Sequence, residues 1–124
     1  MRIFKTRWFH RWAERERLTD TSLVRAVGDL GSGLVDANLG GNLFKKRIAV
    51  QGVGKRAGLR ILLASRNQER VIFIYGFRKS QKANINDREL RALKLLATEL
   101  LSYGTHELAL ALKYGALVEV QNGE

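Results

Sequence analysis

Residues 43–82 contain three short strand-like runs that are separated by turn-forming residues, and the first of them alternates apolar and basic side chains. The runs cover 43–50, 59–65 and 70–77. The last run is rich in β-branched and aromatic residues on both faces, which is typical of a central strand. Because the connections between the runs are short, we expect an antiparallel sheet over 43–77.

This stretch also carries the charge of the protein. Between positions 37 and 82 there are eleven Lys or Arg and a single acid, Glu69, which together account for the formal net charge of +10. Positive charge concentrated in one sheet creates a local field that attracts polyanions. The charge therefore favours a nucleic acid as the partner, although an anionic membrane or an acidic protein would fit it too.

The N-terminal residues predict a short strand followed by a helix. Residues 1–5 give the strand, and the hydroxyl of Thr6 is suited to cap the helix, which we expect to end near position 17. Trp8, Phe9 and Trp12 then fall on one side of that helix, and this spacing indicates a stripe that faces the core.

A second helix follows after a break of about three residues. Thr19 or Asp20 caps it, and Gly31 is placed to end it because glycine readily adopts the left-handed cap conformation. The two helices are expected to form a hairpin over 6–31. The segment 36–42 has no periodic pattern and is expected to be a loop.

Two more helices are predicted within 87–115. Asn86 and Glu89 have the spacing of a capping box at the start of the first, and Thr105 is expected to cap the second. The segment 117–120 is compatible either with a short edge strand or with an ordered tail. The chain therefore predicts the order β-αα-βββ-αα, an α+β domain over all 124 residues, with the helical hairpin packed on one face of an antiparallel sheet.

Composition limits the chemistry. With no Cys there is no thiolate zinc site, and His10 and His106 are far apart in sequence, so we expect no metal and no cofactor. The longest apolar run has seven residues, much shorter than a membrane-spanning helix, and the N-terminus lacks the apolar region of a secretory signal. We therefore expect a cytoplasmic protein that has no membrane partner.

No carboxylate pair and no Ser-His-Asp set is visible, so any catalysis would depend on basic groups. Cleavage of RNA by its own 2′-hydroxyl suits such groups, because it needs the phosphate held, its extra charge stabilised and protons transferred. A basic sheet face more often binds nucleic acid than cleaves it, so binding without catalysis is the alternative at this point.

Four motifs resemble the RelE/HigB toxins of bacterial type II toxin–antitoxin pairs. They are LFKKRI (43–48), GKRAGLRILLA (54–64), VIFIYGFRKSQKANI (71–85) and ELRALKLLATELL (89–101). The resemblance extends from the Trp-rich first helix to about Leu101. It implies a small α+β toxin whose basic concave sheet enters the ribosomal A site and cleaves mRNA during translation by 2′-hydroxyl attack. It also implies an antitoxin that covers the basic face or the grooves beside the first helix and the helix at 87–102.

The resemblance assigns roles to individual basic residues. Lys45 and Arg47 would hold phosphate, Lys45 would assist proton transfer, and Arg60 would stabilise the transition-state phosphate. The implied catalytic residues are Arg60, Lys45, Arg47 and Lys79; those implied to bind RNA or the ribosome are Lys46, Lys55, Arg56, Arg78 and Lys82.

The sequence departs from the family pattern at the acid–base group. Several relatives carry a Tyr or His near the C-terminal end, whereas Tyr103 and Tyr114 here lie in no matching motif, and Tyr75 has a mid-strand position compatible with the core. The same fold also hosts ParE-like inhibitors of DNA gyrase. A binding-only gyrase inhibitor and a non-catalytic nucleic-acid-binding module are therefore the alternatives to the ribosome-dependent endoribonuclease.

Overall fold

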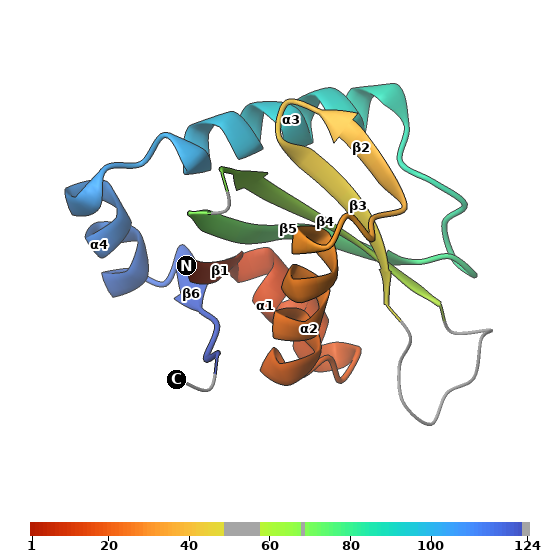
Figure 1. Cartoon of the computed structure of the whole chain (residues 1–124), viewed down its shortest axis with the longest axis horizontal. Coiled ribbons are helices and arrows are strands. Elements are labelled where there is room, and N and C mark those ends of the chain that lie inside the picture. Colours follow the sequence, from red (N-terminus) through yellow and green to blue (C-terminus); the bar gives the residue numbers. More distant parts are fainter. Residues whose placement is uncertain (49–57, 68, 123–124) are drawn as a thin grey trace.

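A computed structural model of the chain describes residues 1–48, 58–67 and 69–122. In chain order the elements are β1 (Arg2–Thr6), α1 (Arg7–Arg15), α2 (Asp20–Gly31), β2 (Ala37–Gly40), β3 (Leu43–Ile48), β4 (Leu59–Arg66), β5 (Arg70–Arg78), α3 (Asp87–Leu101), α4 (Thr105–Lys113) and β6 (Leu117–Glu119). Within these described ranges six strands form one sheet in the order β2-β3-β4-β5-β1-β6. Helices α1 and α2 lie on one face of the sheet, and α3 crosses the other (Figure 1). The predicted α+β class is confirmed, whereas the order of strands and helices and the placement of the helical hairpin differ in detail from the prediction.

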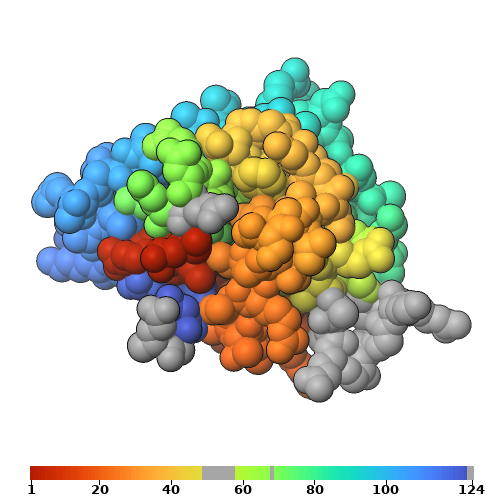
Figure 2. All heavy atoms as spheres, in the orientation of Figure 1, coloured from red at the N-terminus to blue at the C-terminus, as the bar shows by residue number. Residues whose placement is uncertain are grey.

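The sheet is mixed, so the prediction of a wholly antiparallel sheet is wrong. The strand β1 pairs in parallel with β5, with Arg2 opposite Arg70. A long crossover through two helices and three strands separates these partners, which makes parallel pairing possible. Figure 2 shows the N-terminal strand (red) at the surface between α2 (orange) and the C-terminal residues (blue).

Two further strands extend the sheet at its edges. The strand β2 pairs with β3, so the expected loop over 36–42 is wrong for 37–40. Positive φ angles at Gly40, Gly41 and Asn42 make the tight turn into β3. At the other edge β6 pairs with β1, so of the two alternatives for 117–120 the edge strand is correct and the ordered tail is not.

The helix starts follow local capping chemistry. The hydroxyl of Thr6 accepts a hydrogen bond from the N–H of Phe9 and caps α1. Thr19, and not Asp20, caps α2 by accepting from the N–H of Ser22.

The caps of the C-terminal helices differ from each other. Asn86 and Glu89 form the predicted capping box at the start of α3. The N-cap of α4 is Gly104 instead of the expected Thr105, and its backbone N–H donates to the Glu107 carboxylate at 2.9 Å.

The face covered by α1 and α2 has an aromatic core. Phe9 stacks on Phe73 with ring centroids 5.3 Å apart, and Trp12 lies directly on Gly76. A Cβ at Gly76 would stand 2.2 Å from a ring carbon of Trp12, so the indole needs glycine beneath it. Trp8 remains 45% exposed, so the expected core-facing stripe is wrong at that position.

The face covered by α3 and α4 has an aliphatic core in which Leu62 and Ile72 lie with Leu100. Two arginines fix the C-terminal end of α3 against the sheet. Arg66 donates to the carbonyl of Leu101 at 3.3 Å, and Arg70 donates to the carbonyl of Leu100 at 3.2 Å. These bonds satisfy carbonyls that a helix end leaves without intrahelical partners.

The strand β5 contains a β-bulge at Ile74. Tyr75 lies opposite Leu62, whereas Phe73 lies opposite the next residue of β4, so Ile74 is the additional residue. The carbonyl of Ile74 accepts a hydrogen bond from the hydroxyl of Thr6 at 3.3 Å. Beyond the bulge the alternation of β5 is shifted by one residue, and Tyr75 therefore points to the side of the sheet that α3 covers.

Candidate nucleic-acid interface

Three neighbouring strands bring basic and aromatic side chains to one face of the sheet. Arg60 on β4 lies opposite Arg47 on β3 and opposite Phe77 on β5. In the next row, Leu62 lies opposite Lys45 and Tyr75. Because directly opposite residues point to the same side of a sheet, the six side chains share the face of the sheet on which α3 lies, and Leu62 and Phe77 are buried there. We call this set the basic face; it consists of Lys45, Arg47, Arg60, Leu62, Tyr75 and Phe77.

The two arginines of the basic face oppose each other. Like charges directly across two strands destabilise a sheet, so this pairing is unfavourable for folding alone. Asp36 is the ion-pair partner that the described residues supply to Arg60, and its carboxylate oxygen lies 3.9 Å from Nε. The segment 49–57, which is outside the described residues, contains no Asp or Glu that could neutralise Arg47. The pair therefore favours a bound anion.

The environment of Arg60 suits phosphate binding. The residue is only 8% exposed, which fixes its position between neighbouring strands. Within the described residues its guanidinium donates no hydrogen bond, and its side chain is 10% exposed. A held guanidinium with free donors can bind phosphate oxygens through two parallel hydrogen bonds.

Two of the residues implied to bind RNA lie on the opposite face. Lys46 is directed toward α2, where its ammonium lies 3.3 Å from the carboxylate of Asp29. Arg78 is directed toward α1, where its Nε donates to both carboxylate oxygens of Glu16, one of them at 3.0 Å. The structure does not bring these two residues to the basic face.

The remaining basic residues lie after β5 or outside the described ranges. Lys79 is exposed directly after the strand, and its backbone N–H donates to the carbonyl of Gly58 at 3.1 Å. Lys82 contacts the carboxylate of Glu89 at 2.8 Å, and this hydrogen bond raises the pKa of Lys82. A lysine with a raised pKa stays charged, so Lys82 is poorly suited to act as a general base. Lys55 and Arg56 lie outside the described residues.

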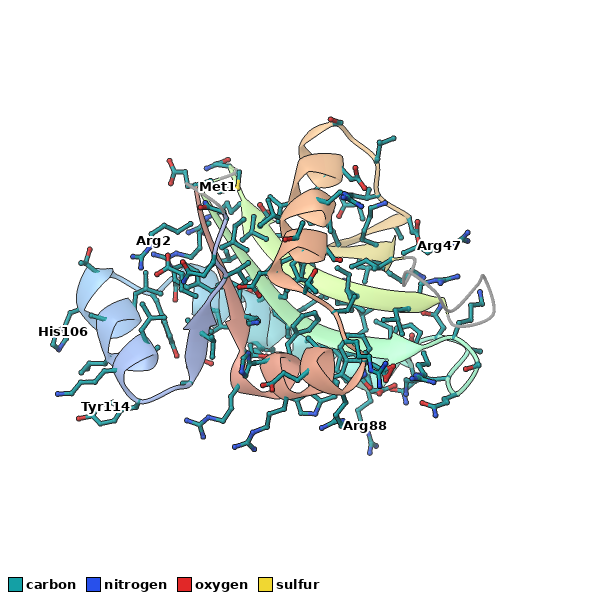
Figure 3. The ribbon with its side chains drawn as sticks, turned by 90° about the horizontal axis from the view of Figure 1, so that it is seen from below. Met1, Arg2, Arg47, Arg88, His106 and Tyr114 are labelled. Atoms are coloured by element: carbon teal, nitrogen blue, oxygen red, sulfur yellow. The ribbon has the colours of Figure 1, made fainter. Side chains whose placement is uncertain are left out.

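The aromatic members of the basic face were missed by sequence reasoning. Tyr75 is half-buried, and its ring stacks on Trp8 with centroids 4.8 Å apart. No alternation pattern could reveal its direction, because the bulge at Ile74 changes it. Tyr114, one of the tyrosines considered for proton transfer, lies at the end of the molecule opposite Arg47 (Figure 3). Tyr103 lines the same surface groove as Tyr114.

The described residues present neither a metal site nor a membrane-spanning helix. Across residues 1–48, 58–67 and 69–122 no group of three or more His, Asp or Glu is placed to hold a metal ion. In the same ranges no helix has the length and apolar character needed to cross a membrane.

Fold and face together define a small α+β protein with a basic sheet surface suited to a polyanion. Residues 1–120 match the family model described as RelE toxin of the RelE/RelB toxin–antitoxin system. The chain belongs to the RelE toxin family, as the motif resemblance indicated, and this membership implies an antitoxin partner. No curated protein matches the chain.

Proposed function

We propose that this toxin is a ribosome-dependent endoribonuclease that cleaves mRNA at the basic face and thereby inhibits translation. The observation that carries the proposal is the pair Arg47 and Arg60, directly opposite each other and beside Lys45. Family membership supports it, since toxins of this family generally inhibit translation as endoribonucleases.

The reaction needs no external nucleophile. The 2′-oxygen of one nucleotide attacks the adjacent phosphorus, the bond to the 5′-oxygen of the next nucleotide breaks, and a 2′,3′-cyclic phosphate remains. One proton leaves the 2′-hydroxyl and another reaches the departing 5′-oxygen. The protein must hold the phosphate and stabilise the added negative charge, which is often the largest contribution to catalysis.

The residues of the basic face divide these tasks. Arg60, buried between neighbouring strands, stabilises the phosphorane. Arg47 holds the same phosphate from the neighbouring strand, and Lys45 assists proton transfer. Lys79, at the exposed end of β5, adds positive charge for the flanking phosphate.

The experiment compares purified protein on free mRNA and on mRNA in translating ribosomes, with cut sites mapped by primer extension. We expect cuts only with ribosomes and in phase with codons. Arg60→Ala should lower the cleavage rate by about 100- to 1000-fold, the loss typical of one well-placed donor. Arg60→Lys should recover little, because an ammonium cannot bind phosphate in the bidentate manner of a guanidinium.

Arg91→Ala, at an exposed position of α3, is the matched control and should cleave at the wild-type rate. Circular dichroism establishes that each variant is folded. A folded Arg60→Ala protein with undiminished cleavage would refute the assignment. A wild-type protein that arrests growth without cutting mRNA would favour the gyrase inhibitor, which a supercoiling assay then tests.

A further inference from the structure

The outer surface of α1 carries an aromatic and basic stripe that the reaction does not use. Trp8, Arg11 and Arg15 are all exposed, and their spacing of three and four residues places them on one side of the helix. Single exposed apolar residues are common and need no explanation. Here, however, the exposed indole stands in line with two arginines. The nearest acid on the helix, Glu14, lies close to His10, with its Oε1 2.7 Å from Nε2.

Two aromatic neighbours fix the orientation of Trp8. Its ring is nearly parallel to Tyr75, at an interplanar angle of 22°, and to Trp12, at 11° with centroids 6.2 Å apart. The indole is therefore held rigidly and is still 45% exposed. A rigid, exposed aromatic ring next to arginines is the arrangement with which proteins stack unpaired nucleobases.

Tyr75 connects this stripe with the basic face. It belongs to the row of Lys45 and Leu62, and it also stacks on Trp8 at the sheet edge, where β1 ends and α1 begins. Side chains of the basic face thus lead from Arg47 across β4 and β5 to Trp8 on α1. Two strand spacings of about 4.8 Å and a rise of about 10 Å along α1 make the track on the order of 20 Å long.

We propose that Trp8 is a stacking platform for an unpaired base of single-stranded RNA, and that Arg11 and Arg15 bind the phosphates of the same segment. The inference rests on the proposed function, because it places the RNA that flanks the cleaved phosphate. A protein partner could also use Trp and Arg as anchors. Within the described residues Arg11 and Arg15 form no ion pair, since Glu14 lies against His10, and Tyr75 links Trp8 to the basic face; both observations favour RNA.

The first test measures the binding of a fluorescently labelled, 2′-O-methylated RNA ten-mer by anisotropy. This probe cannot be cleaved because its nucleophile is blocked. Trp8→Ala should weaken its affinity about 5- to 150-fold, the range for losing one stacked base. Trp8→Phe should retain most of the affinity. Tyr114→Ala, which removes an exposed aromatic ring beside Lys113 at the end of α4, is the matched control and should change the affinity less than about twofold.

The second test removes the base instead of the indole. An abasic nucleotide is moved along the ten-mer, and wild-type protein should lose affinity at one position at which Trp8→Ala is insensitive. Such coupling identifies direct contact. If Trp8→Ala fails to fold, Trp8→Phe and the abasic series on wild-type protein still give the result. Equal losses at every position, or no loss at any, would overturn the proposal.

Cleavage on ribosomes separates this proposal from the proposed function. Unchanged RNA affinity of Trp8→Ala, alongside a wild-type protein that cleaves and an Arg60→Ala variant that does not, would overturn the platform and leave the nuclease intact. Binding that depends on Trp8, without cleavage by wild type, would support the platform and remove the nuclease. Unchanged RNA affinity with a weakened complex with the co-expressed antitoxin would assign Trp8 to a protein interface and overturn the proposal.

Discussion

Replacing Arg47 by Gln should stabilise the fold while weakening RNA binding. The substitution keeps most of the side-chain stem and removes one of two like charges that face each other across β3 and β4. Arg47 is exposed and forms no ion pair among the residues that the structure describes, so the change removes repulsion without breaking an attraction there.

The size of the effect follows from the register. Directly opposite residues have Cβ atoms about 5 Å apart, and extended guanidinium groups lie farther from each other, at about 7 Å. Two unit charges at about 7 Å repel by about 0.6 kcal/mol in bulk water and by about 2.4 kcal/mol at an effective dielectric constant of 20. Arg47 is exposed and Asp36 offsets part of the charge on Arg60, so we expect about 0.5–1 kcal/mol. For a chain of this size that corresponds to about 2–4 °C in the melting temperature.

The assay is thermal unfolding, followed by circular dichroism at about 0.05 M and about 1 M salt. The gain of Arg47→Gln over wild type should shrink at high salt, where the Debye length falls to about 3 Å. Arg91→Gln on α3 is the control and should shift the melting temperature by less than about 1 °C. A lower melting temperature for Arg47→Gln, or the same gain at both salt concentrations, would refute the claim that this arginine pair is strained in the free protein.

Three other predictions concern the scaffold. Gly76→Ala should destabilise the protein by about 1–3 kcal/mol in urea denaturation, because its Cβ would overlap the ring of Trp12. Asn86→Ala should cost about 1 kcal/mol by the same measurement, since it removes the acceptor for the N–H of Glu89 at 2.8 Å. Asp20 accepts hydrogen bonds from the backbone N–H of Gln121 at 2.9 Å and from the ammonium of Lys5 at 3.0 Å. Burial acts to raise the pKa of Asp20, but these partners outweigh it and the pKa is lowered. The stabilisation that Asp20 contributes to the fold is therefore fully present above its unfolded pKa of about 3.9 and is lost as the pH falls through its lower folded pKa. The melting temperature of the wild type should decrease as the pH falls below about 4, and that of Asp20→Asn should decrease less.

Each of these predictions has a contrary result. An Asn86→Gly protein should lose only a few tenths of a kcal/mol, and an equal loss for Gly and Ala would speak against the cap. Full stability of Gly76→Ala would mean that Trp12 does not rest on the strand. An acid transition that is identical in wild type and Asp20→Asn would show that other carboxyl groups set it.

Much of the fold was predictable because it depends on neighbouring residues. Caps such as Thr6 and the Asn86–Glu89 box act within one turn of helix, so spacing alone locates them. The parallel pairing of β1 with β5 depends on residues about 68 positions apart, such as Arg2 and Arg70, and no local pattern records it. The strand β2 was missed because it has only four residues, so its short alternation is hard to distinguish from the glycine-containing turn that follows it.

The candidate site was predictable only in part for the same reason. Alternation within β3 places Lys45 and Arg47 on one face, but the position of Arg60 opposite Arg47 requires the register between two strands. Lys46 and Arg78 are equally basic in sequence, yet helical acids far away in the chain, Asp29 and Glu16, engage them on the other face. The number of basic residues in the sequence could not therefore distinguish Lys46 and Arg78 from the basic residues of the basic face.

The bulge at Ile74 divides β5 into two halves of opposite phase. If the same residues paired without the bulge, Ile74 would lie opposite Leu62, Tyr75 would turn toward α1 and Gly76 would come to the basic face. The space under α1 is already occupied by Trp12, so Tyr75 would have no room there. A slip of one residue in the register of β5 would therefore disrupt the basic face while every Lys and Arg in it is retained. Among variants of this chain, the register between β4 and β5 should be as decisive for the toxin as the identity of its charged residues.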